Sequence, residues 1–357
     1  MEEEQPKKKK RPLLKIFIAI LIVFILIFSS VFYYIQVLWN NVNHDNEFNK
    51  ADLGYNSVID KNIYNIALFG VDTRELDSFS GHSDTIMILS VNKKEKTAKL
   101  ISIMRDSLVP IKENNKTKYN KINYAYYSGG PELAVKTLNS VFGLDISDYA
   151  TVNFYGLADI IDAVGGLDIE LTRSEVTAEL GINAMIKEQC LYLNKNFNDE
   201  KITKWGVQHL NGIGATAYSR IRYAKNANGN TNDYGRTERQ RLVLQKLLDK
   251  ILNLSITEYP ALIEKILPYI KTSISQSEII SLASVFATNP ELQQERVPND
   301  KYIINEGYIV KNIGSTVYYN YEFAGKTIRN FIYDDMSVED YINQNGVDKT
   351  RWYKSFN

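Results

Sequence analysis

The sequence predicts an α/β fold, a three-layer α/β/α domain around a mixed sheet, preceded by an N-terminal transmembrane helix. Three observations support this prediction. Apolar runs of strand length alternate with helical patterns along most of the chain. Residues 16–35 form a run of 20 residues without a formal charge, enough to cross a bilayer as a helix. No Gly/Ser/Pro-rich linker divides the rest of the 357 residues, so one large domain is expected.

The strongly basic stretch 7–11 precedes the apolar run and should keep the N-terminus in the cytoplasm. A cleaved signal peptide would have a shorter apolar core and a small-x-small site after it. We therefore expect a single-pass type II protein of the cell membrane, with its large domain outside the cell. Its predicted parts are a cytoplasmic tail (1–15), a signal-anchor helix (16–38), an extracellular stalk (39–61) and the extracellular domain (62–357).

Strands are expected where apolar runs of strand length end at turn residues. These runs are 63–69, 84–91, 96–104, 149–154, 167–171, 302–310 and 316–323, with the second and third joined as a hairpin. Helices are expected from 3–4 periodicity, or from a proline suited to a first turn. They are 131–141, 155–164, 211–223, 236–254, 256–270 and 276–287. Residues 172–210 are expected to form a surface excursion, and 224–235 a polar loop.

Composition excludes several classes of protein. The 42 basic residues balance the 42 acidic residues, which argues against bulk nucleic-acid binding. A single cysteine, Cys190, rules out an intrachain disulfide and a multi-cysteine metal site, and it is expected to be a small buried apolar side chain. The histidines His44, His82 and His209 lack zinc-ligand spacing.

Two aspartates lie at neighbouring strand ends. Asp72 follows the first strand of the domain, and Asp84 opens the second. Adjacent strand ends are a common place for a divalent-cation site, and oxygen ligands suit Mg²⁺. The alternative is that both aspartates only solvate turns.

Arginines and a glutamine gather near a helix start. Arg236, Arg239 and Gln240 lie three and four residues apart, so they can share one helix face. Arg220 and Arg222 precede them. Guanidinium groups match phosphate oxygens in a bidentate way, which favours an anionic ligand. The alternative is a solvated face whose arginines pair with Glu238.

Seven segments stand in a specific order along the chain. They are NIALFGVDTR (65–74), HSDTIMILSVN (82–92), ISIMRDSLV (101–109), KINYAYYSGG (121–130), VNFYGLADIIDAVGG (152–166), YSRIRY (218–223) and DYGRTERQ (233–240). Together they resemble the LytR–CpsA–Psr family over residues 63–254, with C-terminal helices and strands following at 255–357.

The resemblance implies a phosphotransferase. Such an enzyme attaches a polyprenyl-pyrophosphate-linked glycopolymer, of the teichoic acid or capsular polysaccharide type, to peptidoglycan and releases polyprenyl phosphate. The lipid tail would lie in a hydrophobic tunnel of the α/β/α domain. The implied partners are the lipid-linked glycan, peptidoglycan and the membrane bilayer, with no nucleic acid.

Matched position by position, the resemblance also implies site residues. The metal ligands would be Asp72 and Asp84, holding Mg²⁺ or alternatively Mn²⁺. The catalytic set would be Arg105, Arg220, Arg222 and Arg236, with Asp106 and Asp233 as candidates for the base. The pyrophosphate would also contact Arg74, His82, Lys121, Arg239 and Gln240. His82 stands where the family commonly has arginine, and Met104 where it commonly has proline.

Two other functions remain open at this point. The same residues would serve a hydrolase that splits lipid pyrophosphates with water. A non-enzymatic envelope regulator could bind lipid-linked intermediates without turnover, although binding alone does not require a metal at the scissile bond.

Overall fold

The computed structural model describes residues 42–71, 78–114, 116–254, 269–288 and 290–350, together with positions 37, 39, 40, 258, 262, 264 and 265. Residues up to Val42 form one unit and Asn43–Asn357 another, and the second is described below. Within the described residues, no helix is long and apolar enough to cross a membrane. The predicted span 16–35 and most of the predicted helix 256–270 lie outside the described residues.

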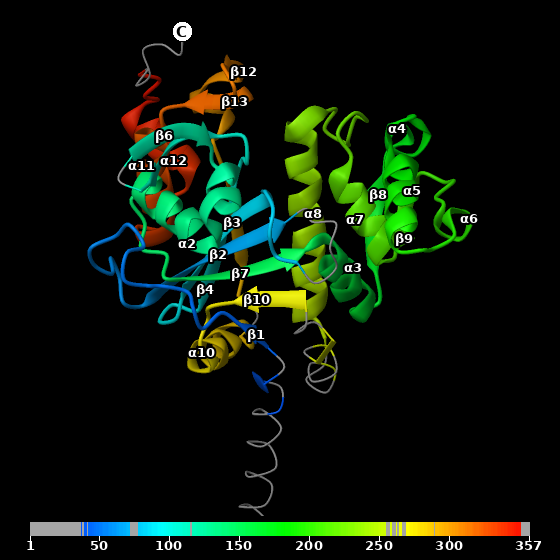
Figure 1. The fold of residues 1–357 in the computed structure, drawn as a ribbon, viewed down its shortest axis with the longest axis horizontal. Helices are drawn as coiled ribbons and strands as arrows, with labels where there is room; N and C mark the ends of the chain where they lie inside the picture. The colour runs from blue at the N-terminus through cyan, green and yellow to red at the C-terminus, as the bar shows by residue number, and fades with distance from the viewer. Residues whose placement is uncertain are drawn as a thin grey trace, which may run out of the picture. The chain divides into compact units, whose positions relative to one another are not determined.

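A seven-stranded mixed sheet forms the centre of this unit (Figure 1). Its order is β1 (Asn43–His44), β10 (Ile270–Thr272), β7 (Asp148–Asn153), β2 (Ile63–Val71), β3 (Ser83–Asn92), β4 (Thr97–Ile103) and β11 (Leu292–Val297). The pairs β1–β10, β2–β7 and β4–β11 are parallel, and the other neighbours are antiparallel. The mixed sheet and the predicted β3–β4 hairpin are confirmed.

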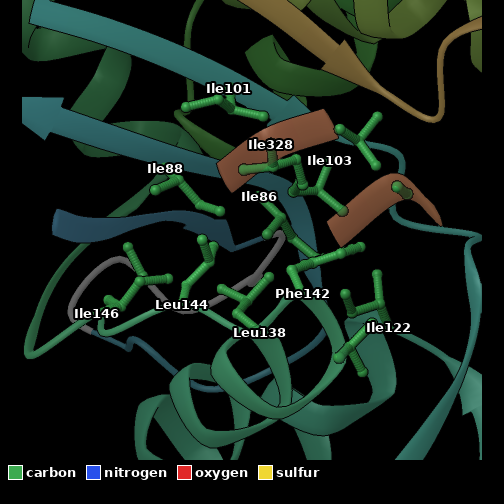
Figure 2. Close-up of a cluster of buried hydrophobic side chains, with 14 of the residues drawn as sticks. Ile86, Ile88, Ile101, Ile103, Ile122, Leu138, Phe142, Leu144, Ile146 and Ile328 are labelled. Atoms are coloured by element: carbon green, nitrogen blue, oxygen red, sulfur yellow. The ribbon is translucent and has the colours of Figure 1, made fainter. Parts of the chain in front are cut away.

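Helices cover both faces of the sheet. Side chains along each strand alternate between the two faces, so one strand contributes to the core on each side. In β2, Ala67 and Phe69 pack into the larger core with α2 (Asn123–Phe142) and α11 (Tyr321–Tyr333), whereas Ile66 packs with α10 (Gln276–Phe286). Figure 2 shows part of the larger core, where isoleucines of β3 and β4 gather with Leu138 and Phe142 of α2.

A second core lies beside the sheet, around α3 (Phe154–Ala163), α7 (Gly212–Arg220) and α8 (Asn232–Leu252). Gly212 is required there, because a Cβ on it would lie 2.0 Å from the Ala158 carbonyl oxygen. The same core includes the hairpin β8 (Leu167–Leu171) and β9 (Gly206–Leu210), with α4 (Arg173–Thr177), α5 (Ile182–Tyr192) and α6 (Phe197–Glu200) nearby.

The prediction of a surface excursion over 172–210 is therefore wrong. Ile182, Ile186 and Cys190 of α5 are buried in the second core, so this segment is part of the folded interior. Burial also raises the pKa of the Cys190 thiol, as expected for a small apolar side chain rather than a nucleophile.

The predicted stalk over 39–61 is also wrong for the residues from Asn43 on. Asn43 and His44 form the edge strand β1, Phe48 packs against the ring of Tyr149 at 5.0 Å, and Leu53 is 2% exposed. The sequence did not predict this packing, because Phe48 and Leu53 are isolated apolar residues in a polar segment without periodicity. The segment thus belongs to the domain.

Two further hairpins complete the fold; the strands of the first were not predicted, whereas the strands of the second were predicted over 302–310 and 316–323 but not as a pair. β5 (Leu108–Glu113) pairs with β6 (Lys116–Lys121), and β12 (Ile303–Val310) pairs with β13 (Gly314–Tyr319). The strand predicted over 316–323 stops at Tyr319, because Asn320 caps the start of α11. The one-turn helix η2 (Asp300–Tyr302) precedes β12, and α12 (Val338–Asn345) follows α11.

The helix predicted over 131–141 starts earlier, at Asn123. Its first part is separated from Pro131 by a kink at Gly129 and Gly130, whose backbone angles are not helical. Pro131 thus begins the second half of α2, where its missing N–H leaves no donor unpaired within a helical turn.

Candidate active site

Asp84 and Arg105 meet at one end of the sheet because β3 and β4 are antiparallel. The register pairs Ile86 with Ile103, and continuing it by two residues sets Asp84 opposite Arg105. The Arg105 guanidinium forms an ion pair with the Asp84 carboxylate there. Both side chains are largely buried, at 16% and 11% exposure, which strengthens their interaction.

Arg236 approaches the same carboxylate from helix α8. Its Nη1 lies 3.5 Å from the second carboxylate oxygen of Asp84, and its side chain is 4% exposed. Asp84 therefore joins two arginines from separate elements, one at the end of a sheet strand and one in the first turns of a helix.

A pocket of about 210 Å³ opens in front of this carboxylate. We call it the arginine pocket, and it brings together five of the predicted site residues. Its lining is Asp84, Leu180, Met185, Arg220, Arg222, Tyr223, Arg236 and Gln240. Arg220 donates to the half-exposed Glu188 carboxylate at 3.1 Å, a partner that sequence reasoning missed. Three guanidinium groups facing one cavity suit a ligand with several anionic oxygens.

A second cavity of about 210 Å³, the apolar pocket, lies between α3, α8 and strands β2 and β7. The side chains that line it are mostly apolar, among them Leu68, Met87, Val152, Leu157, Ile160, Val243, Leu244 and Leu247. Gln240 lines both this cavity and the arginine pocket. Its Nε2 is buried and has no hydrogen-bond partner among the described residues, so it can donate to a ligand at the junction.

A larger groove of about 1170 Å³ adjoins the arginine pocket on another side. We call it the polar groove. Arg222 lines both it and the arginine pocket. In the lining of the polar groove, the Asp106 carboxylate lies 2.8 Å from Lys121 Nζ and 3.4 Å from Arg105 Nε, so two cations flank it.

Arg239 does not line any of these three cavities, and its prediction as a pyrophosphate ligand is corrected. Its side chain is fully buried, and its Nε donates to the Glu175 carboxylate at 2.7 Å. Its other nitrogens donate to the carbonyl oxygens of Ile221 and Ala224. Burial and the Glu175 charge raise the pKa of the neighbouring Tyr218, which therefore stays protonated.

Glu175 was missed, although the sequence carried a signal for it. Thr172 and Glu175 form a capping box, in which the Thr172 hydroxyl accepts from the Glu175 N–H and the Glu175 carboxylate accepts from the Thr172 N–H. The pattern Thr-x-x-Glu announces such a cap. Nothing in that pattern indicates the buried arginine partner.

Other predicted residues lie elsewhere. The exposed His82 ring stacks on Tyr127 at 4.4 Å, and His82 lines neither the arginine pocket nor the polar groove. Asp72 and Arg74 lie outside the described residues, and so does the side chain of Asp233 in the first turn of α8. Glu238 accepts hydrogen bonds from Asn226 and Asn230, which does not match the alternative of an arginine-paired surface face.

The donor chemistry of the arginine pocket fits a hard divalent cation bound together with a phosphate ligand. Among the described residues, no group of three His, Cys, Asp or Glu side chains could hold a metal ion alone. Asp84 supplies a buried carboxylate whose oxygens face a polar cavity. Mg²⁺ commonly uses one or two carboxylates plus phosphate oxygens and waters, so Asp84 is compatible with such a site.

The chain belongs to the LytR_cpsA_psr family, whose model matches residues 31–324. This confirms the resemblance predicted from the seven segments. The polyisoprenyl-teichoic acid–peptidoglycan teichoic acid transferase TagU of Bacillus licheniformis is 30% identical over 320 residues, which is 87% of this chain and 94% of that relative.

The corresponding transferase TagV of Bacillus subtilis is 30% identical over 243 residues, 67% of this chain and 57% of the relative, so the chain spans little more than half of that protein. The crystal structure of B. subtilis TagV matches with a TM-score of 0.54 and 25% identity, covering 77% of this chain and 98% of that one. The α/β fold with a mixed sheet is thus one that the family shares.

Replacing Arg239 with Ala is expected to lower the free energy of unfolding by about 3–5 kcal/mol, because the buried Glu175 carboxylate would lose its counter-charge. Urea unfolding of the full-length protein in mild detergent measures the change. The matched control is Arg173→Ala, an exposed arginine over the Trp205 ring at 5.6 Å, expected to cost under about 1 kcal/mol. Equal stability of the two variants would contradict the structural role of Arg239.

Proposed function

We propose that this protein transfers a glycopolymer from a polyprenyl pyrophosphate carrier to peptidoglycan, with release of polyprenyl phosphate. The observation that carries the proposal is that an apolar pocket and an arginine-lined pocket lie on either side of one shared lining residue, Gln240. A lipid pyrophosphate has the same division between an apolar chain and an anionic head. The names of the TagU and TagV relatives supply the polymer type and the acceptor.

The lipid chain would occupy the apolar pocket. Leu244 and Leu247 of α8 line this cavity together with Leu68 and Met87 of the sheet, so both a helix and the sheet give the chain an apolar surface. Burying the chain there contributes roughly 25 cal/mol per Å² of apolar surface removed from water. The buried Gln240 Nε2 would donate to the first phosphate oxygen at the end of the chain.

The pyrophosphate would bind in the arginine pocket, where Arg220, Arg222 and Arg236 supply guanidinium donors. In phosphoryl transfer, negative charge spreads over the non-bridging and leaving oxygens. Donors already held in place stabilise that charge without reorganising. Arg236 is held by Asp84, so its position does not depend on the ligand.

In the proposed reaction, a hydroxyl oxygen of the acceptor glycan forms a bond to the phosphorus that carries the polymer. The bond from that phosphorus to the oxygen bridging toward the lipid breaks, and polyprenyl monophosphate leaves. The Asp106 carboxylate, flanked by Lys121 and Arg105, would receive the hydroxyl proton. No covalent enzyme intermediate is required.

We further propose that Asp84, together with Asp72, holds Mg²⁺, with Mn²⁺ as an alternative ion. Bound there, the cation would neutralise charge on the phosphate oxygens.

We also propose that the domain lies outside the cell membrane as a type II protein anchored by residues 16–38. Protease added to intact protoplasts is then expected to remove the residues beyond Val42, where the second unit begins. Immunoblots against an N-terminal tag and a C-terminal tag follow the two parts. A domain that is degraded only after membrane lysis would contradict this topology.

Replacing Arg236 with Ala is expected to reduce the transfer rate by about 10²–10³, because one preorganised donor to the transition state is lost. Arg236→Lys should rescue poorly, since it keeps the charge but not the two-pronged guanidinium. The assay follows a radiolabelled lipid-linked glycan onto peptidoglycan oligomers.

Arg173→Ala serves as the control for this experiment, because this exposed arginine lines none of the three cavities. Equal transfer by the Arg236 variants and the control would refute the role of the arginine pocket. Release of free glycan phosphate without transfer would instead support the hydrolase alternative.

Replacing Asp84 with Asn is expected to reduce transfer by at least about 10², because the carboxylate both holds two arginines and contributes to the proposed metal site. Binding of Mn²⁺ by the full-length protein, followed by electron paramagnetic resonance, gives a readout independent of turnover. Asp168→Asn, at an exposed carboxylate of β8, is the control. Mn²⁺ binding of equal affinity in both variants would remove Asp84 from the metal site.

A further inference from the structure

The polar groove is the largest of the three cavities. In the proposed function the lipid pyrophosphate occupies the other two, so the groove is left without a ligand. Its lining is Met104, Arg105, Asp106, Lys121, Arg222, Gly229, Asn230, Thr231, Asn232, Asp300, Ile303, Glu306, Gly307, Ser315, Thr316 and Val317. About half of these residues come from η2 and the hairpin β12–β13, C-terminal to the segments that carry the family resemblance. A cavity of about 1170 Å³ can hold several sugar or amino-acid residues.

The three cavities follow one another in a fixed order. Among their described lining residues, the apolar pocket meets the arginine pocket at Gln240, and the arginine pocket meets the polar groove at Arg222. The apolar pocket and the groove have no described lining residue in common. In a phosphoryl transfer the attacking and leaving oxygens lie roughly in line on opposite sides of phosphorus. If the leaving lipid phosphate occupies the apolar side, the attacking group must come from the groove side.

The lining of the groove indicates what could bind. Hydroxyl and amide side chains form part of the lining, which suits a ligand rich in hydroxyl and amide groups. Cations (Arg105, Lys121 and Arg222) and carboxylates (Asp106, Asp300 and Glu306) both line it, so a ligand with charges of both signs fits better than a polyanion. A nucleic acid or a second lipid pyrophosphate would meet repulsion from these carboxylates. A glycan that carries short peptides has the matching groups.

One wall of the groove is fixed to the proposed catalytic residues. The Val317 N–H of β13 donates to the Asp106 carbonyl oxygen at 2.8 Å, and Val317 forms a bridge with Ser107. The Thr316 hydroxyl donates to the Tyr308 carbonyl oxygen across the hairpin. The hairpin β12–β13 therefore holds Ser315 and Glu306 in a defined position relative to the Asp106 carboxylate.

We infer that the polar groove is the acceptor subsite, and that it binds a peptide-bearing glycan strand so that one of its hydroxyl groups lies beside Asp106. The inference rests on the proposed transferase function. The cations of the lining would face carboxylates of the acceptor peptides, and Glu306 would face their amino groups, whereas Asp300 is already paired with Arg296.

The first experiment blocks the groove with Ser315→Trp, at an exposed position on β13. The matched control is Thr97→Trp, an exposed hydroxyl residue at the start of β4 that lines none of the three cavities. Equilibrium binding of fluorescent soluble peptidoglycan oligomers to the full-length protein is measured without donor. Ser315→Trp is expected to weaken binding at least about tenfold and to raise KM for the acceptor similarly, with donor binding unchanged. Thr97→Trp should resemble the unmodified protein.

The second experiment tests charge recognition with Glu306→Lys, an exposed position that tolerates the change without burying a charge. It is expected to weaken binding of oligomers with free amino groups more than binding of N-acetylated oligomers. An equal effect on both would overturn the role given to Glu306.

The outcomes separate the two proposals. Equal acceptor binding and KM in Ser315→Trp and Thr97→Trp would overturn the acceptor subsite while leaving the transferase function standing. If the unmodified protein binds the oligomers but transfers no glycan, and Ser315→Trp abolishes this binding, the acceptor subsite is supported and the transferase function is overturned.

Discussion

The buried ion pair between Glu175 and Arg239 is the constraint on which the candidate active site depends. Both side chains are fully removed from solvent, so the loss of either would leave an uncompensated charge in the interior. Arg239 also donates to the carbonyl oxygens of Ile221 and Ala224, which ties α8 to the segment just after α7. The last residue of α7, this segment and α8 carry the arginines of the pocket, which are Arg220, Arg222 and Arg236. Their positions therefore follow from an arginine that does not face the cavity.

The mixed sheet explains why carboxylate, guanidinium and apolar groups can meet at one edge. The parallel strands β2 and β7 end there and line the apolar pocket. Strand β3 runs antiparallel to both β2 and β4, so Asp84 at its start lies beside the end of β2 and opposite Arg105 after β4. A purely parallel sheet would have put the start of β3 at the far edge. The reversal of β3 thus sets the anionic centre of the site against the end of the apolar cavity, where a ligand with a lipid chain and a charged head needs it.

Local pattern predicted the strands β2, β3, β4, β7 and β8 because each is an apolar run ended by a turn signal. It failed where burial depends on partners distant in the sequence. Strand β11 is LQQERV, a polar run that becomes a strand by pairing in parallel with β4. Phe48 and Leu53 looked like isolated apolar residues in a polar segment, and α5 is only weakly amphipathic, yet all are buried against elements far along the chain. Sequence periodicity can identify the apolar face of a helix or strand, but it cannot identify the distant element that packs against that face.

The same limit applies to the site. Spacing placed Arg236, Arg239 and Gln240 near one face of α8, but successive residues differ by about 100° around a helix. Such a face is wide enough for Arg236 and Gln240 to reach the pocket while Arg239 turns inward to Glu175. What decides between them is a carboxylate 64 residues away in the sequence, which no helical pattern contains. The resemblance assigned Arg239 to the ligand from its position beside Arg236 and Gln240, whereas the geometry separates the side chains that line the pocket from the one that pairs with Glu175.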